Sequence, residues 1–324
     1  MRGCPIVLFG TLFLYTFLLA DERDEKAWNR TVPTNPKDLL EIQERMQALL
    51  PKVQGAVVSI EAKDGAGSGI IVSKDGLVLT AAHVIGTSKK KMFVRLPDGK
   101  RAPAVSLGGS ELSDAGMLKI TKSGPWPFVE MAPKRSSKLG DWCFGLGHPG
   151  GFDKERGLVV RLGRVIGRMD ETVRTDSRLL GGDSGGPLFD FEGRVIAIHS
   201  RISKKPDENF HVPIDSYLAN WDFFQNEDLF TIKKMEKGGF LGVACKETES
   251  GVIVVETIEE TPAEDTGLQP DDLIVSIDEE KIDSREELTI LISSKEPGDE
   301  ITLEYQRKGT SMSSVIKLGK RPAE

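Results

Sequence analysis

Residues 57–202 consist of short runs of valine, isoleucine and leucine that are separated by turn signals. Val57-Val58-Ser59-Ile60 and Leu77-Val78-Leu79-Thr80 are examples of the runs, and Lys74-Asp75-Gly76 and Pro97-Asp98-Gly99 are examples of the turns. Short β-branched runs bounded by glycine, proline and aspartate are typical of strands, and many such strands at close spacing favour barrels or sandwiches. The pattern therefore predicts a mostly β fold for this part of the chain.

The segment 239–322 has a different character, because it mixes strands with one clear helix. We expect strands at Val252–Glu256, Leu273–Ile277 and Ile301–Tyr305. Ser284 and Glu287 form a capping box, and apolar residues follow on one helical face. These features predict a smaller α+β domain after the β-rich one.

Two helical patterns flank the β-rich segment. Apolar residues recur at helical spacing in 37–50, and Pro51 is expected to end that helix. Residues 214–235 also read as helical, and they lead into Lys237-Gly238-Gly239, which we interpret as a flexible joint. We predict that residues 21–52 form an N-terminal tether and amphipathic helix.

Residues 1–20 have the pattern of an export signal. Arg2 precedes an apolar run from Pro5 to Ala20, and an acidic stretch follows at once. This run is shorter than the ~20 residues that a membrane-spanning helix needs. We predict a cleaved signal peptide, hence an exported protein that is periplasmic or secreted and has no stable membrane span after cleavage. An uncleaved membrane anchor is the alternative.

The net charge of the chain is −7, and the calculated isoelectric point is near 5.4. A nucleic-acid-binding protein normally presents a basic surface. Lys89-Lys90-Lys91 is the one tight basic run, and a solvated loop explains it better than a binding patch. We therefore expect no nucleic-acid partner.

Gly181-Gly182-Asp183-Ser184-Gly185-Gly186-Pro187 surrounds one serine with glycines. A serine hydroxyl is a weak nucleophile at neutral pH, so it needs a base nearby and N–H donors for the anionic intermediate. Glycines permit a backbone turn that aims the N–H groups of Gly182 and Ser184 at one point. We predict Ser184 as the nucleophile and these two groups as the oxyanion hole. Taken alone, such a stretch is more often a surface loop.

Two further motifs supply the base and the acid that orients it. His83 follows an apolar strand in Thr80-Ala81-Ala82-His83-Val84, and Asp114 stands at the entry to another strand. A carboxylate beside an imidazole fixes its tautomer and stabilises the imidazolium. The order His, Asp, Ser is the one found in chymotrypsin. We predict His83, Asp114 and Ser184 as a catalytic triad.

These motifs resemble those of trypsin-like proteases and, over roughly residues 55–322, those of the HtrA/Deg family. The wider match includes Gly65-Ala66-Gly67-Ser68-Gly69, Leu139-Gly140-Asp141-Trp142, Gly147-His148-Pro149 and Thr175-Asp176. The resemblance implies a mostly β fold, with a trypsin-like double β-barrel protease domain over 53–232 and a smaller α+β PDZ domain over 233–324. It also implies that no metal or organic cofactor is needed.

The chain departs from the family pattern at Asp183, where HtrA proteins usually have asparagine. Arg174 or Arg178 could pair with this carboxylate. The resemblance also places the specificity pocket at the segment before Ser184 and at the strand His199-Ser200-Arg201. HtrA proteins usually have small or apolar residues there, so Arg178 and Arg201 are unusual. One hypothesis is that one of them lies at the pocket and favours acidic or polar substrates. The alternative is that both are solvated arginines on the rim.

Gly239-Phe240-Leu241-Gly242-Val243 resembles the carboxylate-binding loop of a PDZ domain. Successive N–H groups can form a nest for a terminal carboxylate, and the strand that follows can accept an extended peptide. We predict Phe240, Leu241, Gly242 and Val243 as peptide-binding residues. The helix at 284–294 would form the other wall of the groove.

As a whole, the resemblance implies an exported ATP-independent serine endopeptidase that cleaves misfolded or damaged envelope proteins. The PDZ domain would bind unfolded polypeptide substrates and peptide C-termini. A non-catalytic holdase or PDZ scaffold on a protease fold is one alternative, and a processing protease with one target is another. Because relatives commonly form trimers through N-terminal segments, we expect a homo-oligomer, although the helix at 37–50 could equally pack on its own barrel.

Overall fold

The structure is a computed structural model that describes residues 26–322 except 63–64, 170–171, 203–204, 206–207, 227 and 249. The expected signal peptide at 1–20 therefore lies outside the described residues, as does the start of the expected tether. In the part of the chain that is described, no helix has the length and apolar character needed to cross a bilayer.

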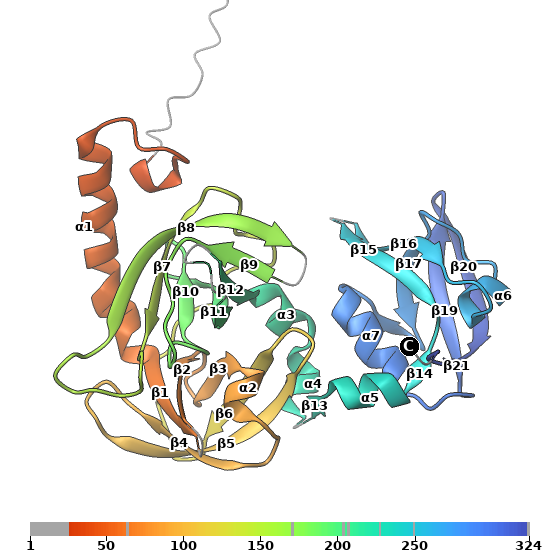
Figure 1. The fold of residues 1–324 in the computed structure, drawn as a ribbon, viewed down its shortest axis with the longest axis horizontal. Helices are drawn as coiled ribbons and strands as arrows, with labels where there is room; N and C mark the ends of the chain where they lie inside the picture. The colour runs from red at the N-terminus through yellow and green to blue at the C-terminus, as the bar shows by residue number, and fades with distance from the viewer. Residues whose placement is uncertain are drawn as a thin grey trace, which may run out of the picture.

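The first β-barrel is built from six strands whose sheet closes because β5 pairs with both β4 and β6 (Figure 1). Its strand order is β5-β4-β1-β2-β3-β6, and β13 (Leu229–Phe230) adds to β5 in parallel. The strands are β1 (Val57–Ala62), β2 (Gly65–Ile71), β3 (Leu77–Ala81), β4 (Lys91–Arg95), β5 (Arg101–Ser110) and β6 (Ala115–Ile120).

The second β-barrel is also closed and has the strand order β10-β11-β12-β9-β8-β7. Its strands are β7 (Trp142–Gly147), β8 (Val159–Met169), β9 (Thr172–Thr175), β10 (Pro187–Phe189), β11 (Val195–Ile202) and β12 (Asn209–Pro213). Stacked rings of Phe144 and Phe189, with centroids 5.2 Å apart, fill part of the core that the two barrels share. The mostly β fold predicted by the strand pattern and the double barrel implied by the family resemblance are both confirmed.

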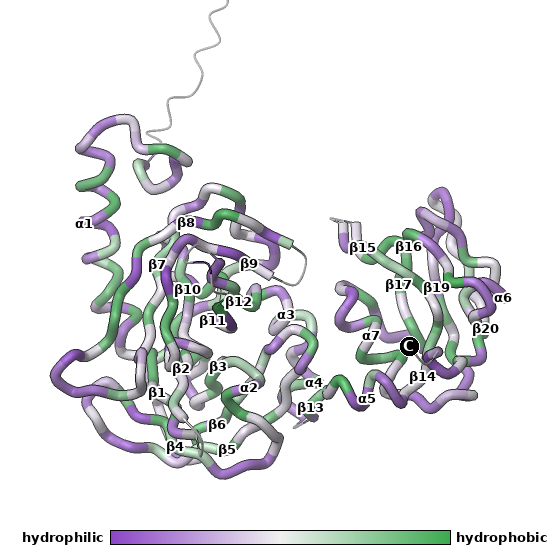
Figure 2. The backbone as a smooth tube through the Cα atoms, in the orientation of Figure 1, coloured by the Kyte–Doolittle hydropathy of each residue, from purple (hydrophilic) through white to green (hydrophobic). Residues whose placement is uncertain are grey.

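Helix α1 (Pro36–Val53) forms as expected and packs on the chain's own second barrel (Figure 1). Hydrophobic and hydrophilic residues alternate along it in Figure 2, and Ile42, Leu49 and Val53 are buried. The Arg45 Nε donates to the Phe191 carbonyl at 2.8 Å. Pro51 does not end the helix, which continues for two more residues to Val53, and this residue is buried in the core. Short 3₁₀ helices η1 (Ala27–Asn29) and η2 (Gln54–Ala56) flank it.

The helical stretch expected at 214–235 is broken into several pieces. These are α3 (Ile214–Ala219), α4 (Trp221–Gln225), β13 and α5 (Ile232–Lys237). The Asn220 side chain donates to the Ser216 carbonyl at 2.9 Å and separates α3 from α4. Strand pairing of Leu229 and Phe230 with β5 then interrupts the helical path. The spacing of apolar residues cannot tell one long helix from this broken path, because the break depends on pairing with β5, which is distant in the sequence.

The C-terminal domain is a smaller α+β unit with its own core (Figure 1). Its main sheet has the order β15-β16-β17-β19-β20, β18 pairs with β17, and β14 pairs with β21. Ser284 caps α7 by accepting from the Glu287 N–H at 3.1 Å, as the capping box predicts. The elements are β14 (Gly239–Phe240), β15 (Val243–Thr248), β16 (Gly251–Thr257), α6 (Pro262–Asp265), β17 (Leu273–Ile277), β18 (Glu280–Lys281), α7 (Arg285–Ser293), β19 (Glu300–Arg307), β20 (Thr310–Lys317) and β21 (Gly319–Lys320).

Candidate active site

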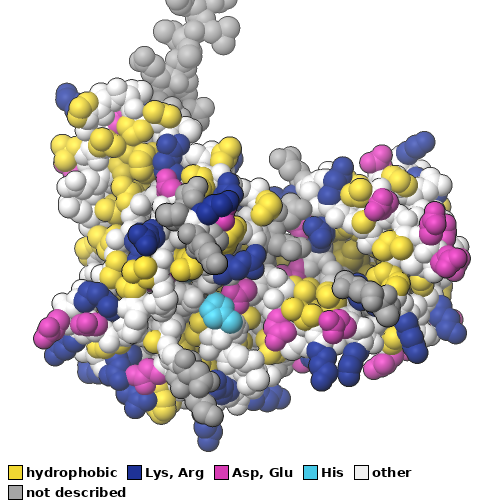
Figure 3. Space-filling view, in the orientation of Figure 1, with side chains coloured by type: hydrophobic (Ala, Val, Ile, Leu, Met, Phe, Trp, Pro, Cys, Tyr) yellow, Lys and Arg dark blue, Asp and Glu magenta, His cyan; other side chains and the backbone are white. Residues whose placement is uncertain are grey.

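His83 and Asp114 are brought together by the pairing of β3 with β6. His83 lies on the one-turn helix α2 (Ala82–Ile85) directly after β3, and Asp114 immediately precedes β6. The His83 Nδ1 lies 2.9 Å from both carboxylate oxygens, and the His83 backbone N–H donates to the same carboxylate at 3.0 Å. Of the four histidines, His83 alone is exposed, in keeping with the histidine side chain visible on the face shown in Figure 3. Its Nε2 is thus the ring nitrogen left for a substrate-side partner.

Ser184 lies on the loop of residues 180–186, which we call the oxyanion loop. Its hydroxyl donates to the Ser200 carbonyl at 3.1 Å, and the Ser200 hydroxyl donates to Asp114 at 2.5 Å. Ser200 therefore connects the serine to the carboxylate of the pair. In the described structure no hydrogen bond joins Ser184 to His83 directly. The sequence placed Ser200 in the specificity pocket, and its contact with Asp114 was not foreseen.

The four backbone carbonyls of Gly181–Ser184 all accept hydrogen bonds from other groups of the protein. The Gly181 carbonyl accepts from Gly150 N–H at 2.7 Å, and the Asp183 carbonyl accepts from Gly186 N–H at 2.8 Å. Ser68 holds the other two, because its hydroxyl donates to Gly182 O at 2.9 Å and its N–H to Ser184 O at 2.8 Å. Among the described residues, nothing accepts from the N–H groups of Gly182 and Ser184. These two donors are available for a ligand oxygen.

Gly182 has the backbone conformation that such a turn requires. Its φ of +96° lies in the region that L side chains rarely adopt. A Cβ at this position would approach the Gly150 nitrogen to 2.5 Å and the His148 carbonyl to 2.7 Å. Glycine is therefore needed here for two separate reasons, conformation and space.

The electrostatics of the pair suit a general base. The hydrogen bond that the His83 ring donates to Asp114 raises the pKa of the imidazole, although burial acts in the opposite direction. Burial raises the pKa of the Asp114 carboxyl, but its contacts with His83 and Ser200 outweigh this, and the net shift is downward. The carboxylate consequently stays ionised and stabilises a protonated imidazole.

Asp183 forms a buried ion pair with Arg161, not with Arg174 or Arg178. Arg161 lies on β8, and its two terminal nitrogens contact the two carboxylate oxygens at 3.2 and 2.7 Å. Arg178 is exposed. The sequence suggested arginines near Asp183 in the chain. The partner instead comes from β8, a strand from an earlier part of the chain, which the closed barrel brings next to the oxyanion loop. The signal that could have found Arg161 is a single charge inside the apolar run Leu158–Leu162.

The residues proposed for the specificity pocket are divided between the surface and the interior. Arg178 and Arg201 are both exposed, and the Arg201 guanidinium lies 5.5 Å from the centre of the Phe210 ring. His199 is completely buried, and its Nδ1 lies 2.9 Å from the Nδ1 of His211. Burial lowers the pKa of His211 to about 3 and that of His199 well below its usual range. Both buried rings are therefore neutral at ordinary pH.

Residues 239–243, which we call the carboxylate loop, comprise β14, the turn at Leu241 and Gly242, and the first residue of β15. The Leu241 and Gly242 carbonyls accept from the N–H groups of Ala263 and Ile258, both at 2.8 Å. No described group accepts from the N–H groups of Leu241 and Gly242. Gly242 has φ +84°, and a Cβ there would collide with the Thr261 side chain. Val243, which begins β15, and Leu291 of α7 are half-buried against the same core.

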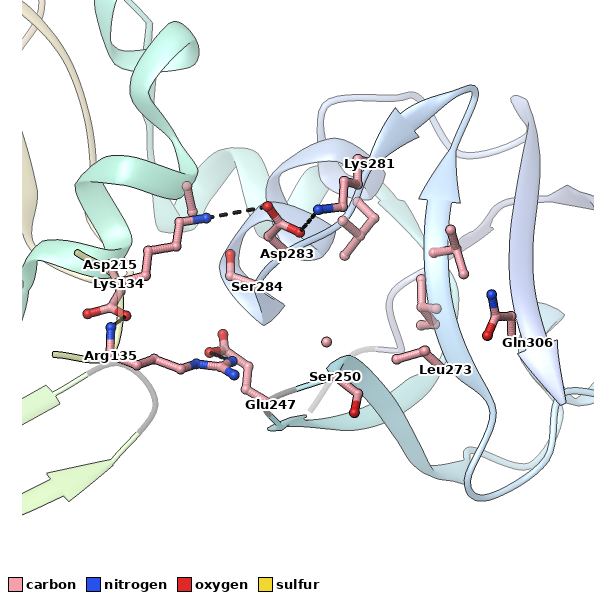
Figure 4. A pocket seen from close by; sticks show the side chains of 15 residues that line it. Lys134, Arg135, Asp215, Glu247, Ser250, Leu273, Lys281, Asp283, Ser284 and Gln306 are labelled. Carbon is pink, nitrogen blue, oxygen red and sulfur yellow. Dashed lines mark hydrogen bonds and ion pairs between the residues drawn. The ribbon is translucent and has the colours of Figure 1, made fainter. Parts of the chain in front are cut away.

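A cavity of about 460 Å³ lies between the second barrel and the C-terminal domain (Figure 4). Charged side chains from both domains meet there. Lys134 lies 3.4 Å from Asp283, and Arg135 lies 3.8 Å from Glu247. Neither Ser184 nor His83 lines this cavity, so it is separate from the candidate active site. Within the described residues, no cluster of three or more histidine, cysteine or acidic side chains is arranged to hold a metal ion.

Comparison with known families agrees with this two-part architecture. The chain matches the trypsin-like peptidase domain family over residues 67–198 and the PDZ domain family over residues 239–318. A Hahella chejuensis protein named "Probable periplasmic serine endoprotease DegP-like" is 32% identical over 278 residues, covering 80% of this chain and 58% of that protein. A protein of the same name from Pseudomonas fulva is 29% identical over 309 residues, covering 89% and 63%. The chain thus spans less than two thirds of these relatives.

Solved structures show the same fold. The serine endoprotease from Yersinia pestis superposes with a TM-score of 0.56 at 21% identity, covering 85% of this chain and 98% of that one. A structure described as "HtrA-type protease AlgW with tripeptide" gives 0.58 at 23% identity, covering 86% and 98%. At these identities the likeness concerns the fold alone. The two domain matches show that this chain carries a trypsin-like peptidase domain followed by a PDZ domain, and its sequence is similar to those of DegP-like serine endoproteases.

Proposed function

We propose that this chain is a serine endopeptidase with His83, Asp114 and Ser184 as its catalytic triad. The observation that carries the proposal is the oxyanion loop, in which the four carbonyls of Gly181–Ser184 all accept hydrogen bonds while the Gly182 and Ser184 N–H groups stay free. Donors fixed in advance at the place where negative charge develops are usually the largest single contribution to acyl-transfer catalysis. The His83–Asp114 pair supplies the base that the neighbouring hydroxyl needs.

In the proposed reaction, the Ser184 hydroxyl turns from the Ser200 carbonyl towards the Nε2 of His83. It then attacks the scissile peptide carbonyl while His83 takes its proton, and the carbonyl oxygen moves between the Gly182 and Ser184 N–H groups. His83 next protonates the leaving amine, and water releases the acyl group. Hydrogen bonds at catalytic sites without substrate are often longer than in the reacting complex, so the present serine orientation is compatible with this sequence.

For the C-terminal domain, the proposed ligand is a peptide C-terminus. The free N–H groups of Leu241 and Gly242 can receive a carboxylate, and β15 is an edge strand that can pair with an extended peptide. Phe240 and Val243 flank these donors. Structures of AlgW, whose descriptions name bound peptides, make the same ligand class reasonable here. Holding a substrate tail would raise its effective concentration near Ser184.

The physiological role that fits best is cleavage of misfolded or damaged proteins outside the cytoplasm. Curated relatives named as probable periplasmic endoproteases support an exported, periplasmic location, and the apolar start of the chain supports a signal peptide at 1–20. The corresponding domain division is 21–52 for the tether and α1, 53–232 for the protease and 233–324 for the PDZ domain. Assembly into a homo-oligomer is part of the proposal.

A fluorophosphonate probe tests the catalytic proposal directly, because it reacts with an activated serine and places its oxygen in the oxyanion hole. We expect rapid labelling of the full chain, none of Ser184→Ala, and casein cleavage only by the first. Ser311→Ala, which changes an exposed serine of β20, is the matched control and should label normally.

Absence of labelling in a folded protein that still binds peptides would instead favour the non-catalytic scaffold. A narrow cleavage profile without casein degradation would favour a dedicated processing protease. The same peptide-library profile tests whether Arg178 or Arg201 attracts acidic residues, because a preference for valine or alanine at the cut site contradicts that idea.

A further inference from the structure

The ion pair beneath the oxyanion loop has a role that the triad does not explain. We propose that Arg161 is a positioning residue that holds the oxyanion loop in the conformation with free Gly182 and Ser184 N–H groups, acting through the Asp183 carboxylate. This inference rests on the proposed function, because it concerns the assembly of the same site.

The geometry of the pair is that of a fixed fork. The Arg161 nitrogens contact the Asp183 oxygens at 2.7 and 3.2 Å, and the two side chains are only 11% and 0% exposed. Two parallel contacts between a planar guanidinium and a carboxylate fix direction as well as distance. The carboxylate also accepts from the Leu180 N–H at 2.8 Å. One side chain therefore fixes both the start of the loop and the residue before the nucleophile.

Arg161 is mounted on a rigid part of the barrel. It stands on β8 opposite Gly145 of β7, and β7 ends at Gly147. Gly147 lies so close to Asp183 that a Cβ at this glycine would collide with the carboxylate. Asp183 is therefore held between the end of one strand and a guanidinium from its neighbour. Its chain neighbours on either side, Gly182 and Ser184, carry the two free N–H groups.

The energetic argument concerns what remains if the cation is removed. A buried carboxylate without a partner is strongly unfavourable, and the loss is relieved when the group moves towards water. Asp183 can reach water only if the oxyanion loop leaves its place, which displaces Gly182 and Ser184 together. Burial raises the pKa of the Asp183 carboxyl overall, and the Leu180 N–H, Arg161 and Arg156 act in the opposite direction; of the two arginines, Arg156 is exposed and makes no hydrogen bond or ion pair with Asp183. Arg161 is thus the cation on which the loop depends.

The test compares Arg161→Gln, Asp183→Asn and the double variant with the wild type, using fluorophosphonate labelling and peptide hydrolysis. We expect Arg161→Gln to lower the labelling rate and kcat by about 100-fold, the scale of losing an oxyanion donor, with KM changed by less than about threefold. The double variant should recover at least about tenfold, because it leaves no buried charge unpaired. Arg194→Gln breaks a partly exposed pair with Asp190 and is the matched control, expected to keep full activity.

A folded Arg161→Gln variant with wild-type labelling would overturn the inference, and so would a folded double variant as slow as the single one. Thermal unfolding checks that each variant folds. If Arg161→Gln fails to fold, Arg161→Lys and the double variant test the inference instead. Lysine keeps the positive charge, so the labelling rate of Arg161→Lys should fall by less than the roughly 100-fold expected for Arg161→Gln. If the wild type itself does not label, the proposed function is wrong. This outcome is therefore distinguishable from a failure of the Arg161 inference alone.

Discussion

The oxyanion loop and the carboxylate loop lie in different domains and share one construction. Each turns at a glycine with positive φ, Gly182 at +96° and Gly242 at +84°. In each, carbonyls next to that glycine are bonded to the body of the domain, while neighbouring N–H groups remain free. Under the proposed function, both are nests whose free backbone donors receive an anion.

The two loops differ in how firmly they are fixed. The oxyanion loop is bonded to Ser68 from the other barrel and to the buried Arg161, whereas backbone contacts and Thr261 hold the carboxylate loop. A peptide carboxylate is a permanent charge, so its binding energy can order a loop. An oxyanion exists only briefly during the reaction, and its donors must be in place beforehand. The difference in support is the one expected if the two loops receive the proposed anions.

The prediction with the largest expected effect removes the negative charge of the carboxylate that orients His83. Asp114→Asn should lower kcat by about 10⁴-fold, because the imidazole loses its orienting carboxylate. In the wild type, Asp114 raises the pKa of His83, so kcat/KM should fall as the pH drops through a value above the ordinary 6.5. The neutral imidazole is the active base, and each further pH unit should cost about tenfold. In Asp114→Asn this limb should move to lower pH.

Peptide binding by the PDZ domain serves as the internal control for that experiment. Its affinity for a C-terminal peptide, measured by fluorescence anisotropy, should be unchanged in Asp114→Asn. A wild-type pH profile with an acid limb well below 6.5 would contradict the role of Asp114 in raising the His83 pKa.

The next test disrupts the oxyanion loop alone. Gly182→Ala places a Cβ against the Gly150 nitrogen and should lower fluorophosphonate labelling by about 100–1,000-fold. Gly157→Ala is the control, since its φ is also positive (+68°) while a Cβ there meets nothing within 4 Å. Equal labelling of both variants would show that the turn at Gly182 does not position the donors.

The smallest expected effect concerns the carboxylate loop. Gly242→Ala should weaken peptide binding by about 5- to 150-fold, because its Cβ collides with Thr261 and such overpacking costs roughly 1–3 kcal/mol. Active-site labelling should be unaffected. Gly309→Ala has the same backbone strain at φ +81° without a collision and is the matched control. If Gly242→Ala binds an amidated and a free-acid peptide equally well, the loop is not a carboxylate site.

Sequence reasoning is strongest where a feature is carried by contiguous residues. The strand pattern predicted a mostly β fold, which the structure confirms. His83, Asp114 and Ser184 each stand in a short pattern with its own turn or strand, and their assignment as a triad stays a prediction. Sequence reasoning failed where partners come from distant segments. Arg161 was not identified as the partner of Asp183, because only the closed β8–β7 pairing places it there. The broken helix after Ile214 has the same cause, since β13 forms only when β5 is present.

Ser68 belongs to the first barrel and makes three contacts with the second, to Gly182, Ser184 and His148. Neither barrel can therefore form the candidate active site by itself. A partly folded chain, in which the two barrels have not yet docked, lacks these contacts even if Ser184 is exposed. We expect the proposed proteolytic activity to appear only after the barrels have docked.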